Sequence, residues 1–237
     1  MSDKYILSIE TATNLCSVSL AKNGNHVLSI VGEEPNLHAT KLTVFIQNLM
    51  GKAGLSLDQL SAVAVSMGPG SYTGLRIGVS TAKGLCYGLD VPLIANNTLE
   101  ALVAGYLGKN ESAIESNSLL VPMIDARRRE VYTAVFDSKG MLLKETEALI
   151  IDENSFDEFL NAGHQVILFG SGADKFEDTF KNHQNIQVVT SFDSIATYQD
   201  RVSYDKFLGQ QFEDVAYFEP FYLKDFVATT PKKSPLL

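Results

Sequence analysis

The feature that most constrains the fold of this chain is a glycine-rich segment between a strand pattern and a helix pattern. Residues 62–66 form the apolar run Ala-Val-Ala-Val-Ser. Residues 68–85 continue as Gly-Pro-Gly-Ser-Tyr-Thr-Gly-Leu-Arg-Ile-Gly-Val-Ser-Thr-Ala-Lys-Gly-Leu. A strand, a glycine turn and a helix in this order are typical of folds that hold a phosphate at a helix N-terminus.

The spacing of these glycines excludes the two common phosphate-binding motifs. A P-loop requires Gly-Lys-Ser/Thr after its variable residues, whereas Gly74 is followed by Leu75 and Arg76. A dinucleotide fingerprint requires G-x-G-x-x-G, and the interval from Gly70 to Gly74 is one residue too long. The segment therefore retains only the general capacity of a helix N-terminus to bind an anion.

The helix pattern carries small residues on one stripe, because Gly74, Gly78 and Ala82 are four positions apart. A glycine in a helix interior costs about 1 kcal/mol relative to alanine, so two on one face need a reason. Small side chains allow another backbone to approach closely. Two interpretations stay open: the stripe packs against the first long helix of its own lobe, or it packs against a partner chain.

The order of elements repeats along the chain. Three strands, a helix, a strand and a helix occur in residues 1–107, and a similar order occurs in 118–226, with little identity between the halves. The polar segment 108–117 is the predicted boundary, and 227–237 is predicted to be a disordered tail. We therefore expect an α/β protein with a duplicated unit, rather than a single Rossmann sheet.

Composition limits the function classes. The net charge is −9 and the pI is about 4.9, which disfavours nucleic-acid binding by the chain alone. Cys16 and Cys86 are far apart in apolar surroundings, so we expect buried free thiols in a reducing compartment. Neither a signal peptide nor an apolar run of about 20 residues is visible. The prediction is a soluble, cytoplasmic protein that does not enter membranes.

The polar motifs do not assemble a catalytic set. Glu10 and the hydroxyls of Thr11 and Thr13 form a turn that either binds its own backbone or faces a metal-bound phosphate. His38 lacks a second ligand one helical turn later, where Leu42 stands. The arginines at 127–129 are interpreted as a solvated turn, with contact to phosphate or an acidic partner as the alternative. No nucleophile–base pair is evident from the spacing.

Several segments, in this order, resemble those of the TsaB (YeaZ-type) family. They are Ile9-Glu-Thr-Ala-Thr13, Leu37-His38, the glycine-rich segment 68–85, Asp125-Ala-Arg-Arg-Arg-Glu-Val-Tyr132 and Pro220-Phe-Tyr-Leu-Lys224. The resemblance covers about residues 4–225 and implies the actin-like, Hsp70-like ATPase superfold with two lobes of duplicated RNase H-like topology. It also implies a part in bacterial formation of N6-threonylcarbamoyladenosine at position 37 of tRNAs that read ANN codons.

In this family the chain is implied to be a non-catalytic scaffold and activator. The implied partners are a TsaD-type catalytic subunit and a TsaE-type ATPase, with a homodimer when the chain is alone and tRNA met only through the complex. TsaD proteins carry a His-x-x-x-His metal pair, and Leu42 replaces its second histidine here, so no metal site is expected. Glu10 stands where the family often has Asp, which further disfavours nucleotide hydrolysis.

The expected partner interface comes from the helices at about 37–53 and 72–88. Its candidate residues are His38, Lys41, Leu42, Phe45, Gly74, Arg76, Gly78, Ser80, Ala82 and Lys83. No cofactor is assigned to the chain itself, although ATP or ADP at the partner interface is compatible with the family. The candidate nucleotide contacts are Thr11, Ala12, Thr13, Gly170 and Gly172.

Three rival functions stay open. The first is an ATP-binding or ATP-hydrolysing enzyme of the same superfold, with its cleft between the lobes. The second is a peptide-degrading role, against which the lack of an assembled nucleophile speaks. The third is direct RNA binding through residues 127–129, which the net charge disfavours.

Overall fold

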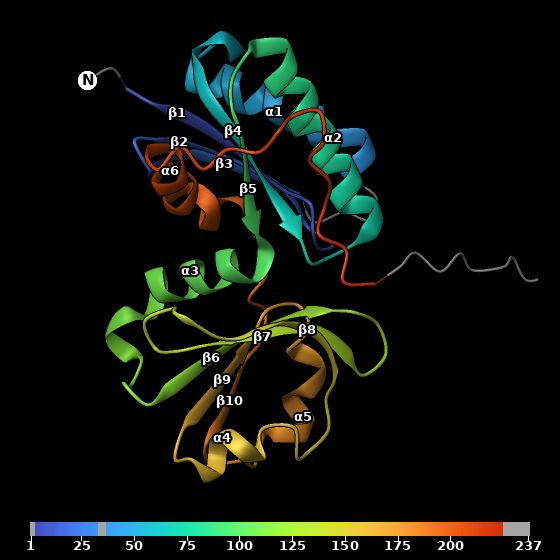
Figure 1. Cartoon of the computed structure of the whole chain (residues 1–237), viewed down its shortest axis with the longest axis vertical. Coiled ribbons are helices and arrows are strands. Elements are labelled where there is room, and N and C mark those ends of the chain that lie inside the picture. Colours follow the sequence, from blue (N-terminus) through green and yellow to red (C-terminus); the bar gives the residue numbers. More distant parts are fainter. Residues whose placement is uncertain (1–2, 33–36, 225–237) are drawn as a thin grey trace, which may run out of the picture.

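A computed structural model describes residues 3–32 and 37–224 and shows two α/β lobes, one above the other (Figure 1). Each lobe is built on a five-stranded sheet, with strand orders β3-β2-β1-β4-β5 and β10-β9-β6-β7-β8. The predicted tail 227–237 lies outside the described residues.

The first sheet begins with an antiparallel meander and continues with two parallel strands. Its strands are β1 (Tyr5–Glu10), β2 (Cys16–Lys22), β3 (Asn25–Gly32), β4 (Leu60–Gly68) and β5 (Leu93–Asn97). Helices α1 (Leu37–Ala53) and α2 (Tyr72–Leu89) cover one face of this sheet (Figure 1). The Ser56 N–H donates to the Gln59 side chain at 2.9 Å, in a capping box that starts the short 3-10 helix Leu57–Gln59.

The second sheet repeats this plan. Its strands are β6 (Ser118–Asp125), β7 (Glu130–Phe136), β8 (Leu142–Ile150), β9 (Gln165–Phe169) and β10 (Ile186–Val189). The connecting helices are α4 (Asp157–Asn161) and α5 (Glu177–Phe180), with 3-10 turns at Glu111–Ala113, Asp174–Phe176 and Ala196–Gln199. Read from β8, the strands follow the same 3-2-1-4-5 order as the first sheet, which confirms the duplication.

Two helices pack against the lobe other than the one to which they were assigned, and this corrects the predicted domain boundaries. Helix α3 (Thr98–Asn110) was expected in the first lobe, but its apolar residues Leu99, Leu102 and Tyr106 pack into a cluster with strands of the second sheet. Helix α6 (Asp200–Leu208) was expected in the second lobe, but its Tyr204 and Phe207 pack under the first sheet. The chain therefore crosses near residue 98 and again between 190 and 200, instead of at 108–117.

The segment after α6 also belongs to the first lobe. Glu213 bridges to Leu93 of β5, and the Phe221 N–H donates to the Met67 carbonyl at 2.8 Å. Phe218 joins the core between the first sheet and the pair α1 and α2. The last described residues thus return to the edge of the cleft between the lobes.

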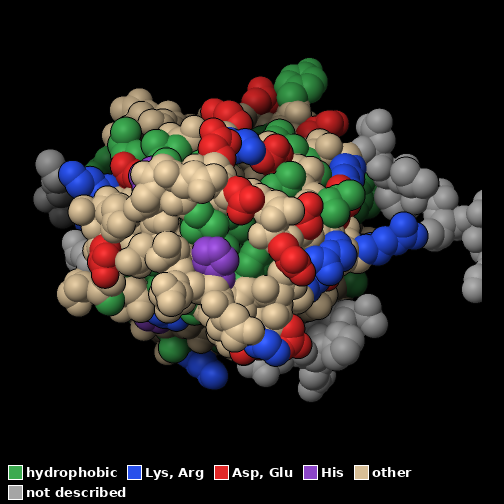
Figure 2. All heavy atoms as spheres, turned by 90° about the horizontal axis from the view of Figure 1, so that it is seen from below, with side chains coloured by type: hydrophobic (Ala, Val, Ile, Leu, Met, Phe, Trp, Pro, Cys, Tyr) green, Lys and Arg blue, Asp and Glu red, His purple; other side chains and the backbone are tan. Residues whose placement is uncertain are grey.

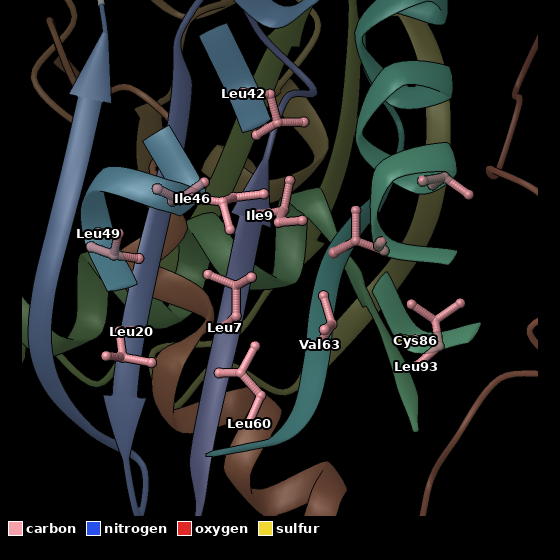
Figure 3. Close-up of a cluster of buried hydrophobic side chains, with 14 of the residues drawn as sticks. Leu7, Ile9, Leu20, Leu42, Ile46, Leu49, Leu60, Val63, Cys86 and Leu93 are labelled. Carbon is pink, nitrogen blue, oxygen red and sulfur yellow. The ribbon is translucent and has the colours of Figure 1, made fainter. Parts of the chain in front are cut away.

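The first-lobe core explains why α1 and α2 have fixed positions. Leu42, Ile46 and Leu49 of α1 enter one buried cluster with Leu7 and Ile9 of β1 (Figure 3). These three positions of α1 follow the i, i+4, i+7 spacing of a single helical face. Each fully buried Leu or Ile side chain contributes about 1.5–3 kcal/mol of hydrophobic free energy, so the inner faces of both helices are committed to the fold.

Candidate functional site

The small-residue stripe of α2 lies inside its own lobe. A Cβ atom on Gly74 would meet the Thr11 carbonyl oxygen, and one on Gly78 would meet the Thr11 hydroxyl. Gly74, Gly78 and Ala82 are all buried in the isolated chain. The prediction that this stripe contacts a partner is therefore wrong. The alternative prediction, that the stripe packs against α1, does not give the main reason for the glycines either. The glycines are required because the turn after β1 passes directly over α2.

A second stripe of small residues on α2 faces outward. Ser80, Gly84 and Gly88 are four positions apart and exposed. A Cβ on Gly84 or Gly88 would have no atom within 4 Å. Tyr87 lies on the same side and is 86% exposed. Sequence inspection missed this stripe, although its i, i+4, i+8 spacing is as regular as that of the buried one.

The remaining predicted interface residues divide between surface and interior. Arg76 and Ser80 are exposed on α2 and Lys41 is exposed on α1. Leu42 is 2% exposed and belongs to the core, so its proposed contact with a partner is corrected. Phe45 is half-buried and packs on the same core.

Two predicted interface residues are engaged within the chain. Lys83 donates to the carbonyl oxygens of Ala216 and Phe218, at 3.1 and 2.9 Å. It therefore fastens the C-terminal segment to α2. The His38 Nε2 lies 3.0 Å from the Leu15 carbonyl oxygen, where it anchors the start of α1 to the hairpin between β1 and β2.

A cavity of about 510 Å³ lies between the lobes. Its walls come from the β1–β2 hairpin, the start of α2, the β6–β7 hairpin and the end of the described chain. They are formed by Ala12, Thr13, Asn14, Gly70, Ser71, Tyr72, Thr73, Ile124, Asp125, Ala126, Arg127, Tyr132, Ser171 and Lys224. A volume of this size accommodates a small-molecule ligand.

The cavity contains part of the predicted nucleotide site. Ala12 and Thr13 line it, whereas Thr11 is turned toward α2. Gly170 and Gly172 are not in its wall, because they pack against the backbone of Met123 and Ile124 in β6. Ser171, between these two glycines, does line it, which the sequence pattern did not indicate.

The carboxylate of Glu10, the last residue of β1, does not face the cavity. Its carboxylate is fully buried and accepts hydrogen bonds from the Ala12 N–H at 2.7 Å, the Ser194 hydroxyl at 2.9 Å and the Gln199 amide at 3.3 Å. The Ser66 hydroxyl donates a further bond. Burial raises the pKa of Glu10 above its ordinary value, and these hydrogen bonds oppose the rise.

This arrangement gives Glu10 a structural role. Ser194 and Gln199 belong to the segment that crosses back to the first lobe, so the carboxylate fastens that crossing to β1 and β4. Among residues 3–32 and 37–224 there is no cluster of three or more His, Cys, Asp or Glu side chains that would hold a metal ion. The arrangement of Glu10 gives no support to a metal-bound phosphate at this turn.

A serine, a histidine and an aspartate also meet on the far side of the first sheet. The Ser19 hydroxyl donates to Asp200 at 2.8 Å, and His26 Nδ1 lies 3.0 Å from the same Asp200 oxygen. In a hydrolytic triad the histidine uses one ring nitrogen for the serine and the other for the acid. Here the same nitrogen, His26 Nδ1, lies near both the Asp200 oxygen and, at 3.2 Å, the Ser19 hydroxyl, and Ser19 is fully buried. This cluster therefore does not present Ser19 as an accessible nucleophile.

The arginine turn between β6 and β7 is exposed and has left-handed backbone at Arg127 (φ 74°) and Arg128 (φ 54°). Arg127 reaches the cavity wall, and Arg129 instead donates to the Ile151 carbonyl at 3.2 Å. Seen from below, the molecule carries acidic side chains across its face and basic ones mainly at the margins (Figure 2). No continuous basic face for RNA is visible from this side.

The doubled sheet order and the inter-lobe cavity define a protein of the actin-like ATPase fold. Solved structures agree with this class. YeaZ from Pseudomonas aeruginosa superimposes with a TM-score of 0.76 at 23% identity, covering 93% of this chain and 100% of that one. The activator of the 2-hydroxyisocaproyl-CoA dehydratase from Clostridium difficile gives 0.50 at 12% identity, covering 87% and 97%. At these identities the likeness concerns the fold alone.

Sequence comparison identifies the family. Residues 33–218 match the family model of TsaD, described as tRNA N6-adenosine threonylcarbamoyltransferase. The tRNA threonylcarbamoyladenosine biosynthesis protein TsaB of Escherichia coli (strain K12) is 33% identical over 179 residues, which are 74% of this chain and 75% of that protein. The protein of the same name from Bacillus subtilis (strain 168) is 30% identical over 229 residues, 92% and 93% of the two chains.

The chain belongs to the TsaB family of tRNA threonylcarbamoyladenosine biosynthesis proteins, within the wider family that the TsaD model describes. The resemblance to this family and the expected role in tRNA threonylcarbamoyladenosine biosynthesis are thereby confirmed. None of the helices in the described part of the chain is both long and apolar enough to cross a membrane.

Proposed function

We propose that this chain is a non-catalytic subunit in the formation of threonylcarbamoyladenosine on tRNA, and that it activates a TsaD-type catalytic subunit by binding it. The observation that carries the proposal is the outer face of α2, formed by Arg76, Ser80, Gly84, Tyr87 and Gly88. This face has the small residues that permit close helix packing, and nothing in the described chain lies against its two glycines.

The chemistry of a helix interface supports this choice. A glycine on an exposed helix face costs about 1 kcal/mol of stability relative to alanine, and Gly84 and Gly88 have no intramolecular neighbour that requires them. Close packing of a second helix against this face would explain why these positions are glycine. Exposed Tyr87 and Arg76 flank the stripe, and tyrosine and arginine are enriched among residues that dominate binding energy at interfaces.

The exposed side of α1 extends the same surface, because α1 and α2 lie side by side over the first sheet (Figure 1). Lys41, Val44 and Gly51 are exposed there, and a Cβ on Gly51 would meet nothing within 4 Å. Two helices from each subunit would form a four-helix contact. An interface of ordinary size would bury about 1,600 Å² in total.

The same surface offers an explanation for a homodimer when the partner is absent, because a twofold interface needs only one self-complementary patch. The TsaE-type ATPase and the tRNA join through the complex in this proposal. The engagement of Glu10 in the crossing segment supports assigning the chemistry to the other subunit.

Reconstitution tests this function. The chain is mixed with a TsaD-type subunit, a TsaE-type ATPase, the threonylcarbamoyl-adenylate donor and an ANN-reading tRNA. Omission of this chain is expected to abolish modification, and addition of this chain without the TsaD-type subunit is expected to give none. Modification by the chain alone would contradict the non-catalytic assignment, and undiminished modification without it would contradict the role of activator.

A further inference from the structure

The two lobes touch at a point that neither chain crossing supplies. Lys224, at the end of the described chain, pairs with Glu130, the first residue of β7 in the second lobe. The Lys224 ammonium also lies 5.9 Å from the centre of the Tyr132 ring, and both residues line the inter-lobe cavity. The contact joins the sequence motifs at 125–132 and 220–224, for which the proposed function has no use.

The C-terminal segment that carries Lys224, residues 213–224, is fixed on the first lobe. Lys83 of α2 donates two hydrogen bonds to its carbonyl oxygens, and the Phe221 N–H donates to the Met67 carbonyl at 2.8 Å. A Cβ atom on Gly68 would lie 2.7 Å from the Phe221 carbonyl oxygen, so the two backbones are in close contact. Figure 1 shows this segment, in red, running along α2 towards the second lobe.

The anchoring continues almost to the ion pair. The ring of Tyr222 packs against that of Tyr72, in the first turn of α2, with 4.9 Å between the ring centres. Aromatic pairs at this spacing add to the packing energy beyond the area that they bury. Lys224 follows two residues later, so its reach is limited. The pair with Glu130 can therefore form only when the second lobe lies close to the end of α2.

We propose that the C-terminal segment is a clasp that holds the cleft closed through Lys224 and Glu130, and that loss of this ion pair lets the lobes move apart. Both lobes contribute to the cavity wall, for example through Thr73 and Asp125, so the spacing of the lobes sets access to the cavity. The clasp acts on an equilibrium between closed and open states.

The exposure of the ion pair makes the clasp reversible. The side chain of Lys224 is 41% exposed and that of Glu130 is 24% exposed. Ion pairs with this much contact to water contribute little free energy, equivalent to a severalfold change in an equilibrium constant. The clasp therefore adjusts the populations of the two states and does not lock one of them.

The test is a distance measurement between the lobes of the full chain by pulsed electron paramagnetic resonance. Nitroxide labels are attached through Asn48→Cys on α1 and Glu158→Cys on α4, which are exposed positions in different lobes. The native Cys16 and Cys86 are buried. Glu130→Gln in this background is expected to raise the ratio of long to short distances about threefold.

The matched control is Glu147→Gln. It makes the same change in charge in the same sheet, but Glu147 pairs at 2.6 Å with Lys144 of its own strand β8. The distances are expected to stay as in the parent. Equal lengthening in the two variants would overturn the inference, because it would show a general effect of charge on the second lobe.

A charge exchange separates the clasp from a loss of folding. Glu130→Lys and Lys224→Glu, each alone, place like charges together and are expected to lengthen the distances more than Glu130→Gln does. The double variant restores an ion pair of reversed direction and is expected to recover the parental distances. Unchanged distances in the three single variants, or a double variant that stays open, would overturn the inference.

The clasp and the proposed function fail independently. The distance measurement contains no partner subunit and does not involve the outer face of α2, so its failure leaves the proposed function untouched. The reconstitution does not depend on the spacing of the lobes in the isolated chain, so its failure leaves the clasp untouched.

Discussion

The hydroxyl of Thr11 occupies the space in which a side chain on Gly78 would lie. Thr11 follows β1 directly and Gly78 is in the middle of α2, so this contact fixes the helix against the turn that leads into the cleft. The two small-residue stripes of α2 therefore have different roles. Gly74 and Gly78 belong to the fold, and Gly84 and Gly88 remain for a partner.

Gly78→Ala is expected to destabilise the chain by about 1–3 kcal/mol, because an added methyl in a filled space displaces its neighbours. Gly84→Ala is the matched control in the same helix, and it is expected to stabilise the chain by up to about 1 kcal/mol. Urea unfolding of both variants gives the two values. Equal effects of the two substitutions would contradict the assignment of the inner stripe.

A double mutant tests whether the hydroxyl of Thr11 is the group that excludes a side chain at 78. This hydroxyl is buried without a hydrogen-bond partner in the described chain. Thr11→Ala in the Gly78→Ala background is therefore expected to recover at least about 1 kcal/mol in a double-mutant cycle. Strictly additive effects would mean that another group opposes the side chain.

Glu10 should make the chain less stable as the pH rises. The folded-state pKa of Glu10 is above the ordinary value of 4.5. At a pH between the ordinary and the folded-state pKa, the folded chain therefore binds more protons than the unfolded chain. The free energy of unfolding falls as the pH rises across that interval. Glu10→Gln removes this dependence. The stability of the variant relative to the parent should therefore increase from pH 4.5 upward, as measured by urea unfolding at several pH values. A constant difference would contradict the assignment.

The two cysteines should be inert in the folded chain. Burial raises the pKa of both thiols, Cys16 and Cys86, to about 11, and the thiolate is the reactive form. A thiol reagent at pH 8 is expected to leave both unmodified until urea unfolds the protein. Rapid labelling of either residue under native conditions would show that its part of the first-lobe core opens.

Lys83 should hold the C-terminal segment on α2. Lys83→Met removes its two hydrogen bonds to the carbonyls of Ala216 and Phe218, at a cost of about 1–3 kcal/mol for bonds to a charged donor. Amide exchange should accelerate in residues 214–222 and stay unchanged in β6. Lys41→Met, which alters an exposed lysine on α1, serves as the control.

Local patterns in the sequence were sufficient to predict the helices and the duplication. The bounds of α1 follow from apolar residues such as Leu42, Ile46 and Leu49, whose spacing defines one face. The crossing of α3 and α6 was not predictable in this way. The apolar residues of α3 show that it is buried, but their spacing is the same whichever sheet covers them.

The candidate site shows the same limit. Gly74 and Gly78 require a close neighbour, and the sequence indicates that requirement, but the neighbour is Thr11, more than 60 positions away. The cavity wall likewise joins Thr13, Arg127 and Lys224, from three distant segments. Contacts of this kind depend on how segments that are distant in the sequence are placed in the fold, which residue spacing does not encode.

The most direct test of the central claim is the affinity of the purified chain for a TsaD-type subunit, measured by calorimetry for two variants. Gly84→Leu places a side chain on the outer stripe of α2, and Gly108→Leu makes the same change on α3, where a Cβ also has open space. If the outer face of α2 is the partner surface, Gly84→Leu is expected to bind at least about thirtyfold more weakly. Gly108→Leu is expected to keep the parental affinity. Parental affinity for both variants, with the complex intact on size exclusion, would contradict it.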